Sequence, residues 1–396
     1  MSPSPHVDAI LRDALEGCDE LALVERLCER LNADGVPLMR AAVGCGFLDP
    51  SFDSHMVRWA RGERSVREMF FRDPTPEGTE AWKISPFRTL VAGTDARLRR
   101  RLGDGYQPGE FPVLDTFRAR GATDYMALVE RVGPSIWVGE SRGVITSWLS
   151  DGPAGFDDAS IELLAAIMPA LSATFLGRTQ HSTTRTLLAT YLGQHAAERV
   201  LAGNVIRGRA EPMRAVVWFA DLVGFTRVAD TSPGDVVLAM LNDYAEAQVE
   251  AIEGQGGHVL KFIGDGLLAI FPGANESSAC LRALDAAVDF RLRVASVSER
   301  RAADGLPVTY AHIALHIGEV LYGNVGSARR LDFTVLGAAV NEAARIEALC
   351  GSLDQPIIVS NVFAQAAGDA RSRLVSLGRY ALKGVAKPQE LFTLDR

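Results

Sequence analysis

The stretch AVVWFADLVGFT, residues 215–226, decides the fold of the second half of the chain. Apolar and aromatic residues run straight into Asp221, and Gly224 follows shortly after it. Such a run predicts a buried β-strand, and the glycine predicts a turn at its end. A carboxylate at the end of a buried strand is costly unless it binds something or caps the helix that follows.

A second carboxylate stands in HVLKFIGDGLLAIF, residues 258–271. Two apolar runs meet at Gly264-Asp265-Gly266, which is typical of a hairpin turn, and taken alone Asp265 is simply a turn residue. Taken together, Asp221 and Asp265 can approach one point, where they would repel each other unless a cation neutralised them. Mg²⁺ favours one or two carboxylates plus substrate phosphates, so the pair predicts a metal site. Two ions there would activate an attacking oxygen and hold a leaving phosphate.

The length of 396 residues favours two domains. From residue 213 to 396 buried-looking strands alternate with helices, which predicts an α+β domain. Residues 1–180 are expected to form a separate α/β domain. The end of this domain is predicted to be two neighbouring strands followed by the helix GFDDASIELLAAIMPALSATFLG. This order resembles the end of a GAF-type sensor domain. Residues 181–212 are predicted to be a helical linker.

One face of that linker is apolar, which leaves two interpretations open. Leu187, Leu188, Tyr191 and Leu192 share a helical face within a helix expected over 185–201. The face can pack against its own domain, or against the same helix of a second copy as in a coiled-coil neck.

Composition restricts the class of protein. The net charge of −8 argues against non-specific binding to nucleic acid. The sequence contains no run of eighteen apolar residues, so no membrane span is predicted. The start MSPSPHVDAILRDALEG does not have the pattern of a signal peptide. The five scattered cysteines are expected to be free thiols in a reducing compartment, which favours a cytoplasmic location.

Four motifs occur in order between residues 219 and 347: FADLVGFT, KFIGDGLLAIF, HIGEVLYGNVG and FTVLGAAVNEAARIE. With them, residues 213–396 resemble the catalytic domain of the class III nucleotidyl cyclases, whose fold is a ferredoxin-like βαββαβ unit. The resemblance implies that Asp221 and Asp265 bind two Mg²⁺ or Mn²⁺ ions per site. It implies that a backbone loop wraps the substrate phosphates, formed here by Leu222, Val223, Gly224, Phe225 and Thr226. It also implies that Lys383 contacts the terminal phosphates.

Asn341 and Arg345 match the family's pair that orients the ribose and stabilises the pentavalent phosphorus. Their i, i+4 spacing places them on one helix face. A guanidinium beside a neutral donor suits a transition state whose negative charge spreads over oxygens. The alternative is a solvent-facing pair, or an Arg345 held by Glu342 or Glu347.

Recognition of the base is implied for Lys261 and Thr334. The lysine is typical of adenine-selective members, and threonine marks a branch of the family in which several members respond to bicarbonate. The Thr334 hydroxyl can accept a hydrogen bond from the adenine amino group, and it can also donate. Asp332 lies two residues earlier, on the same strand face, where it either assists or forms a bridge with Arg329 or Arg330.

These features predict a homodimeric adenylate cyclase that converts ATP to 3′,5′-cyclic AMP and pyrophosphate. In the resembled family the aspartates come from one copy and the lysine, threonine, asparagine and arginine from its partner. An unknown small molecule at the N-terminal domain is the expected regulator, with bicarbonate at the catalytic domain left open. The alternatives are a guanylate cyclase and an inactive nucleotide-binding regulatory module.

Overall fold

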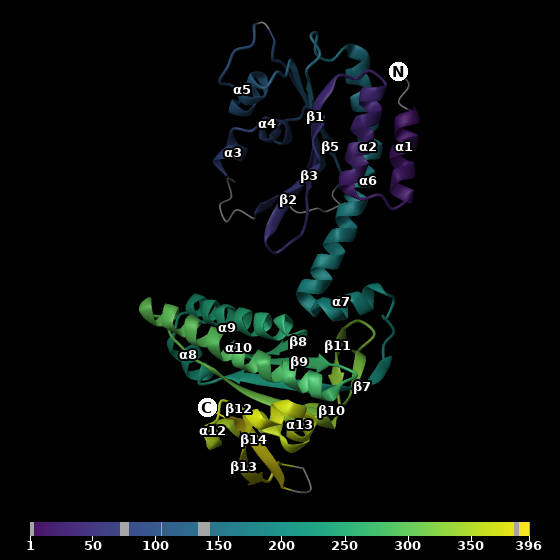
Figure 1. Ribbon diagram of the computed structural model, residues 1–396. Coiled ribbons are helices and arrows are strands. Elements are labelled where there is room, and N and C mark those ends of the chain that lie inside the picture. The colour runs from purple at the N-terminus through teal and green to yellow at the C-terminus, as the bar shows by residue number, and fades with distance from the viewer. Residues whose placement is uncertain (1–3, 72–78, 104, 134–142, 384–387, 396) are drawn as a thin grey trace. The chain divides into compact units, whose positions relative to one another are not determined.

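A computed structural model describes residues 4–71, 79–103, 105–133, 143–383 and 388–395 (Figure 1). The chain divides into two compact units, Met1–Leu187 and Leu188–Arg396. The point of division lies inside the segment 181–212 that was expected to be a linker.

The first unit is built on one six-stranded antiparallel sheet in the order β3-β2-β1-β6-β5-β4. Its strands are β1 (Leu38–Gly46), β2 (Phe52–Ala60), β3 (Val66–Phe71), β4 (Arg97–Arg101), β5 (Asp124–Arg131) and β6 (Gly143–Ser150). Its helices are α1 (Ser4–Leu15), α2 (Glu20–Ala33), α3 (Glu80–Lys83), α4 (Pro86–Ala92), α5 (Pro112–Ala119) and α6 (Asp158–Leu192). The expected pairing of the last two strands is confirmed, because β5 and β6 are neighbours.

Alternation along these strands gives the sheet two apolar faces. One face packs against α1, α2 and α6 around Trp148 and Phe175. The other packs against α4 and α5 around Leu114 and Tyr125. Among the described residues α6 is long and apolar enough to cross a membrane, but most of its apolar window is buried, as expected for a core helix.

The second unit contains an eight-stranded sheet in the order β13-β14-β12-β10-β7-β9-β8, with β11 paired to β10. Its strands are β7 (Ala210–Leu222), β8 (His258–Ile263), β9 (Gly266–Pro272), β10 (Ala311–Gly326), β11 (Leu331–Leu336), β12 (Ile357–Ser360), β13 (Leu374–Tyr380) and β14 (Gln389–Leu394). Its helices are α7 (Gln194–Leu201), α8 (Phe225–Thr231), α9 (Gly234–Gly254), α10 (Glu276–Ala303), α11 (Ala338–Glu347), α12 (Cys350–Leu353), α13 (Asn361–Ala366) and a 3₁₀ helix (Gly368–Arg373).

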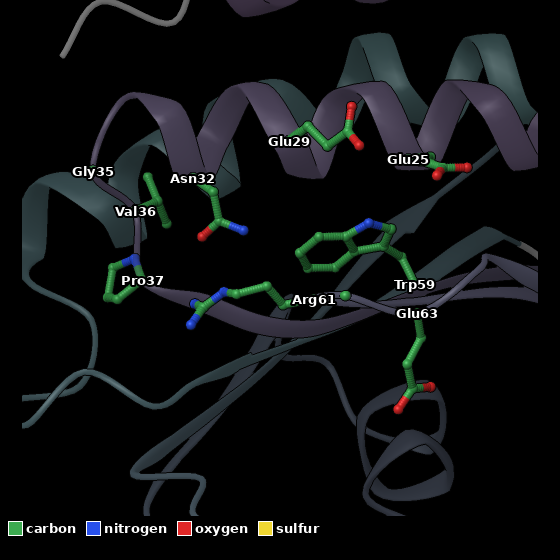
Figure 2. A pocket seen from close by; sticks show the side chains of 10 residues that line it. Glu25, Glu29, Asn32, Gly35, Val36, Pro37, Trp59, Arg61 and Glu63 are labelled. Carbon is green, nitrogen blue, oxygen red and sulfur yellow. The ribbon is translucent and has the colours of Figure 1, made fainter.

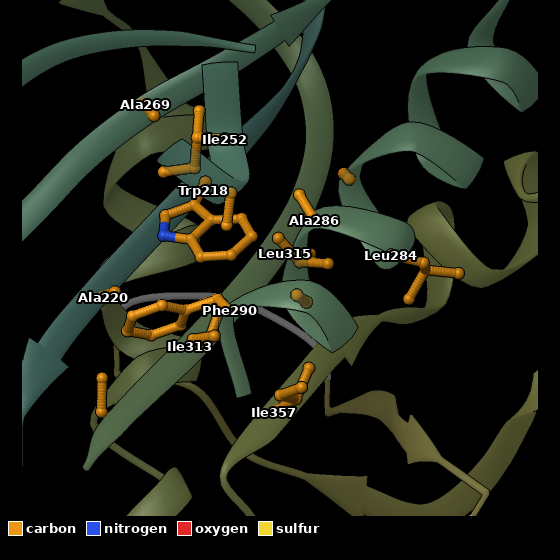
Figure 3. Packing of buried hydrophobic residues seen from close by; sticks show 14 of the residues in the cluster. Trp218, Ala220, Ile252, Ala269, Leu284, Ala286, Phe290, Ile313, Leu315 and Ile357 are labelled. Atoms are coloured by element: carbon orange, nitrogen blue, oxygen red, sulfur yellow. The ribbon is translucent and has the colours of Figure 1, made fainter. Parts of the chain in front are cut away.

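The predicted α+β class and the βαββαβ order are confirmed in this unit. The chain runs β7-α9-β8-β9-α10-β10, and the central strands lie in the order β10-β7-β9-β8. Helices α9 and α10 pack side by side over one face of the sheet. Figure 3 shows the core beneath them, where Trp218 of β7 lies near Phe290 of α10, with a ring-centroid distance of 6.3 Å. This buried layer fixes β7, and with it the position of Asp221.

The helix expected over 185–201 is wrong in one respect, because it breaks at Gly193. Helix α6 ends at Leu192, and α7 begins at Gln194 with Gly193 at φ 82°. A side chain at residue 193 would also lie 2.6 Å from the carbonyl oxygen of Val259. The close approach to β8 therefore requires glycine and ends the long helix.

Candidate functional site

The end of strand β7 and the neighbouring turn of the β8–β9 hairpin bring the predicted aspartates together. Asp221 is the last residue but one of β7, where it pairs with His312 of β10. Asp265 lies in the two-residue turn between β8 and β9, which closes with the pair Ile263–Gly266. Because β9 pairs with β7, the turn lies beside Asp221, and the two carboxyl groups are close enough for a hydrogen bond between them.

The two negative charges of the pair repel each other, which favours the binding of a cation. Burial, and then the charge of Asp265, raise the pKa of Asp221 to about 6. Within the described residues neither carboxylate forms an ion pair with a lysine or arginine, and no third His, Cys, Asp or Glu side chain lies close enough to hold the same metal ion. Two carboxylates without further protein ligands match the way Mg²⁺ is bound in nucleotide sites, where waters and phosphates complete the shell.

Gly266 is a residue of this site that the sequence did not single out. A Cβ atom on it would lie 2.6 Å from the carbonyl oxygen of Ala220 and 3.0 Å from Oδ1 of Asp221. The glycine following Asp265 therefore gives the Asp221 carboxylate room beside the turn. The signal was present in Gly264-Asp265-Gly266, but a turn explained both glycines equally well.

Glu347, at the end of α11, is a third carboxylate near the pair. Its pKa is raised to about 7, by burial first and then by the charges of Asp221 and Asp265. Its Oε1 lies 3.9 Å from Nδ1 of His312, but burial lowers the pKa of this histidine, so the contact is not an ion pair at neutral pH. From the sequence, Glu347 was predicted only as a possible partner of Arg345, and the structure shows no such bridge among the described residues.

Loss of the Glu347 charge is expected to stabilise the metal-free protein at high pH. Its folded pKa lies above the ordinary glutamate value of 4.5, so the folded state holds the proton more tightly than the unfolded chain does. The free energy of unfolding should therefore fall as the pH rises from about 4.5 to about 7 and stay low above that value. At pH 8 Glu347→Gln should recover about 2 kcal/mol, or roughly 4–8 °C in melting temperature.

The measurement is thermal melting in EDTA across this pH range, with the substitution of the exposed Glu253 by Gln as the matched control. The gap between Glu347→Gln and wild type should close as the pH falls to about 5. A gap that is equal at pH 5 and pH 8 would contradict the assignment.

Two hydrogen bonds, to Thr309 and Tyr310, hold the loop that follows Asp221. The amide of Val223 donates to the carbonyl of Tyr310 at 2.8 Å, and the Thr309 hydroxyl donates to the Val223 carbonyl at 2.6 Å. Gly224 then adopts φ 70° and starts α8 at Phe225. The first amides of a helix have no acceptor within it, so this loop can present N–H groups to an anion.

The residues predicted to recognise the purine lie at the β8 and β11 edge. Nζ of Lys261 donates to Oδ2 of Asp332 at 2.7 Å, so of the two alternatives for Asp332 the bridge to Arg329 or Arg330 is not observed among the described residues. Antiparallel pairing of β11 with β10 brings this strand back toward β8, a contact that spacing along the chain does not reveal. Thr334 is 3% exposed, and its hydroxyl has no hydrogen-bond partner in the described structure. A buried unpaired hydroxyl is costly, so it marks a place where a ligand atom would be favourable.

Three further predicted residues stay apart from the aspartates. Asn341 and Arg345 lie on α11, with Asn341 exposed and Arg345 half-buried, and neither has a side-chain partner in the part of the chain that the structure describes. Lys383 is exposed beyond β13. Glu347 lies near the aspartate pair, and residues 345 and 347 of a helix point about 200° apart. Arg345 therefore points away from the side of α11 that carries Glu347, and Asn341 lies about 120° from Glu347 around the helix.

Comparison with known sequences identifies the family that the second unit matches. Residues 210–396 match the family described as adenylate and guanylate cyclase catalytic domain. An adenylate cyclase of Anabaena cylindrica is 33% identical over 168 residues, which cover 40% of this chain and 33% of that protein. An uncharacterised protein of Mycobacterium tuberculosis is 30% identical over 234 residues, which cover 59% of this chain and 40% of that protein. The chain thus spans less than half the length of these relatives.

Among solved structures, a bacterial light-regulated adenylyl cyclase aligns with 71% of this chain and 88% of its own, at a TM-score of 0.50 and 20% sequence identity. Identity this low supports similarity of fold alone.

Proposed function

Residues 210–396 form a catalytic domain of the adenylate and guanylate cyclase family, and from this premise we propose that the chain converts ATP to 3′,5′-cyclic AMP and pyrophosphate. The observation that carries the proposal is the carboxylate pair Asp221 and Asp265, which has no protein cation among the described residues and is kept open by Gly266. An inactive nucleotide-binding module would have no need to keep two repelling carboxylates together.

Each predicted site residue has a separate role in the proposed reaction. Asp221 and Asp265 would hold two divalent ions, Mg²⁺ or Mn²⁺, which lower the pKa of the ribose 3′-hydroxyl and neutralise the leaving pyrophosphate. In the loop from Leu222 to Thr226, the amide of Val223 already donates to the carbonyl of Tyr310. The amides from Gly224 onward are therefore the ones proposed to bind phosphate oxygens, and Lys383 adds positive charge at the terminal phosphates. Asn341 orients the ribose, and Arg345 stabilises the charge that develops on the α-phosphate. Most of the rate enhancement then comes from positioning and electrostatics.

A complete site is proposed to need two copies of the chain. Because Arg345 lies on the side of α11 opposite to Glu347, we infer that Arg345 and Asn341 act at the aspartates of a second copy. A symmetric homodimer would have two such sites, and a monomer none.

Adenine is the proposed base because Lys261 is a donor only and cannot accept the N1–H of guanine. The Thr334 hydroxyl is the proposed acceptor for the adenine amino group. Its burial means that the edge at β8 and β11 must open for the base to enter. Guanylate cyclase remains the alternative function.

Asp332 is proposed to position Lys261 for this role. The pair is partly exposed, so Asp332→Asn should leave the melting temperature unchanged. It should lower kcat/KM for ATP about tenfold, as the loss of a charge-assisted hydrogen bond does, and leave the rate with GTP unaffected. Initial rates with both nucleotides measure the change. Asp289→Asn is the matched control, because it removes the partner of Arg293 on the surface of α10. Equal rates for the two variants would exclude the positioning role.

The choice of base is tested by initial rates with ATP and GTP at equal concentrations, with Mn²⁺ and the full-length chain. Cyclic AMP is expected to form faster than cyclic GMP. Faster formation of cyclic GMP would replace the proposal with its alternative.

Regulation by the first unit belongs to the same proposal. Its sheet with helices on both faces supports a ligand-binding role of the GAF-like kind that the sequence predicts. The boundaries 1–180, 181–212 and 213–396, activation by bicarbonate and a cytoplasmic location stay predictions.

A further inference from the structure

The first unit holds an arginine that its own fold leaves unpaired. Arg40 of β1 is half-buried, and its guanidinium lies 4.9 Å from the centre of the Phe117 ring. It has no hydrogen bond or ion pair among the described residues. Arginine is rarely buried without a partner, because removing its charge from water is costly. Burial, and then the neighbouring charge of Arg58, lower the pKa of Arg40.

Another cavity of this unit contains an arginine that is already paired with a carboxylate. About 610 Å³ lies between α2 and the ends of β1 and β2, beside Trp59, Glu25 and Glu29 (Figure 2). Its arginine, Arg61, already donates to both carboxylate oxygens of Asp151, at 2.8 and 3.1 Å. Among the described residues, an anionic side chain therefore pairs with Arg61 and none pairs with Arg40.

Arg40 lines a second cavity of about 390 Å³ on the other face of the sheet, under α3, α4 and α5. The volume lies at the lower end of the range for small-molecule sites. Most of the wall is apolar, with Met56, Ile84, Phe87 and Phe117 among its residues. The cavity is thus large enough for a small ligand with an apolar body.

Two hydroxyl groups share the wall with Arg40. Tyr125 is 2% exposed and Ser147 is 3% exposed, and neither hydroxyl has a hydrogen-bond partner among the described residues. Burial raises the pKa of Tyr125, so its phenol stays protonated and able to donate. One guanidinium and two hydroxyl donors in an apolar wall match the needs of a single carboxylate on an apolar ligand.

Arg58 and Arg120 add to the positive potential around Arg40, and Glu68 opposes it. Glu68 is already paired with Arg58 at 3.0 Å, so it does not neutralise Arg40. An anion is therefore favoured over a neutral molecule of the same shape.

We propose that this cavity binds a small aromatic carboxylate, with the acid group on Arg40, Tyr125 and Ser147 and the ring among Phe87, Phe117 and Met56. The proposal rests on the first unit alone and does not depend on the reaction of the second. The site gives the first unit a chemically defined ligand class.

The test uses the full-length chain, 2-naphthoate as the probe and 2-naphthamide as its uncharged match, in calorimetric titrations. Naphthoate is expected to bind saturably and at least about tenfold more tightly than the amide, the usual size of a hydrogen bond to a charged group. Arg40→Met should weaken naphthoate binding by a similar factor and leave amide binding unchanged. Arg118→Met, at an exposed arginine stacked on Tyr106, is the control and should change neither.

The comparison of acid and amide on the wild-type chain decides the matter even if Arg40→Met fails to fold. Absence of saturable naphthoate binding, equal affinity for acid and amide, or an equal loss in Arg118→Met would each overturn the proposal.

Discussion

Two inactive variants, Asp265→Ala and Arg345→Ala, are expected to regain about a quarter of the wild-type activity when they are combined in equal amounts. Random exchange between symmetric dimers makes about half of them mixed, and each mixed dimer has one intact site of two. The intact site takes its aspartates from the Arg345→Ala copy and its arginine from the Asp265→Ala copy. The physical reason is the direction of α11, on which Glu347 lies near the aspartates and Arg345 faces away.

The measurement is the rate of cyclic nucleotide formation by each variant alone and by the co-expressed pair. A pair of Asp221→Ala and Asp265→Ala is the matched control. Both changes lie in the same half of the site, so every dimer of that pair stays inactive. Recovery in the control, or no recovery in the first pair despite a confirmed mixed dimer, would show that the site does not span two copies.

Gly266→Ala is expected to reduce activity about 100-fold or more without unfolding the second unit. The new methyl group must displace either the Ala220 carbonyl, at 2.6 Å, or the Asp221 carboxylate, at 3.0 Å. The strand pairing of β7 with β9 holds the carbonyl, so the carboxylate is the group that moves. A displacement of about 1 Å in a catalytic group costs a factor of this size.

Gly273→Ala is the matched control at the far end of β9, because its nearest neighbours would lie 3.4 Å and more from the added Cβ. Activity and Mn²⁺ affinity should both fall in Gly266→Ala and stay near wild type in Gly273→Ala. If Gly266→Ala kept full activity, Asp221 would not need the space that the glycine leaves.

The catalytic unit was predictable because its decisive signals are local. Strands β8 and β9 and their turn follow directly from two apolar runs around Gly264-Asp265, and the turn is confirmed. The run before Asp221 gave β7 in the same way. Once both strands are placed, the closeness of the two aspartates follows from their pairing.

What the sequence did not reveal depends on contacts between distant segments. The partner of Asp332 is Lys261, 71 residues away, and neighbouring arginines were the nearer choice along the chain. The position of Glu347 depends on how α11 crosses β10. Gly193 breaks the helix because β8 lies against it, and nothing in the apolar pattern of the linker indicates that approach.

Asp221 and Asp265 are proposed to hold the metal ions with which this chain cyclises ATP. The most direct test incubates the full-length chain with ATP and Mn²⁺, in parallel with Asp265→Ala, and identifies the products by chromatography. We expect cyclic AMP and pyrophosphate in equal amounts from the wild-type chain and neither from the variant. Cyclic AMP formed equally by both proteins, or no cyclic nucleotide from the wild-type chain, would contradict this role of the two aspartates.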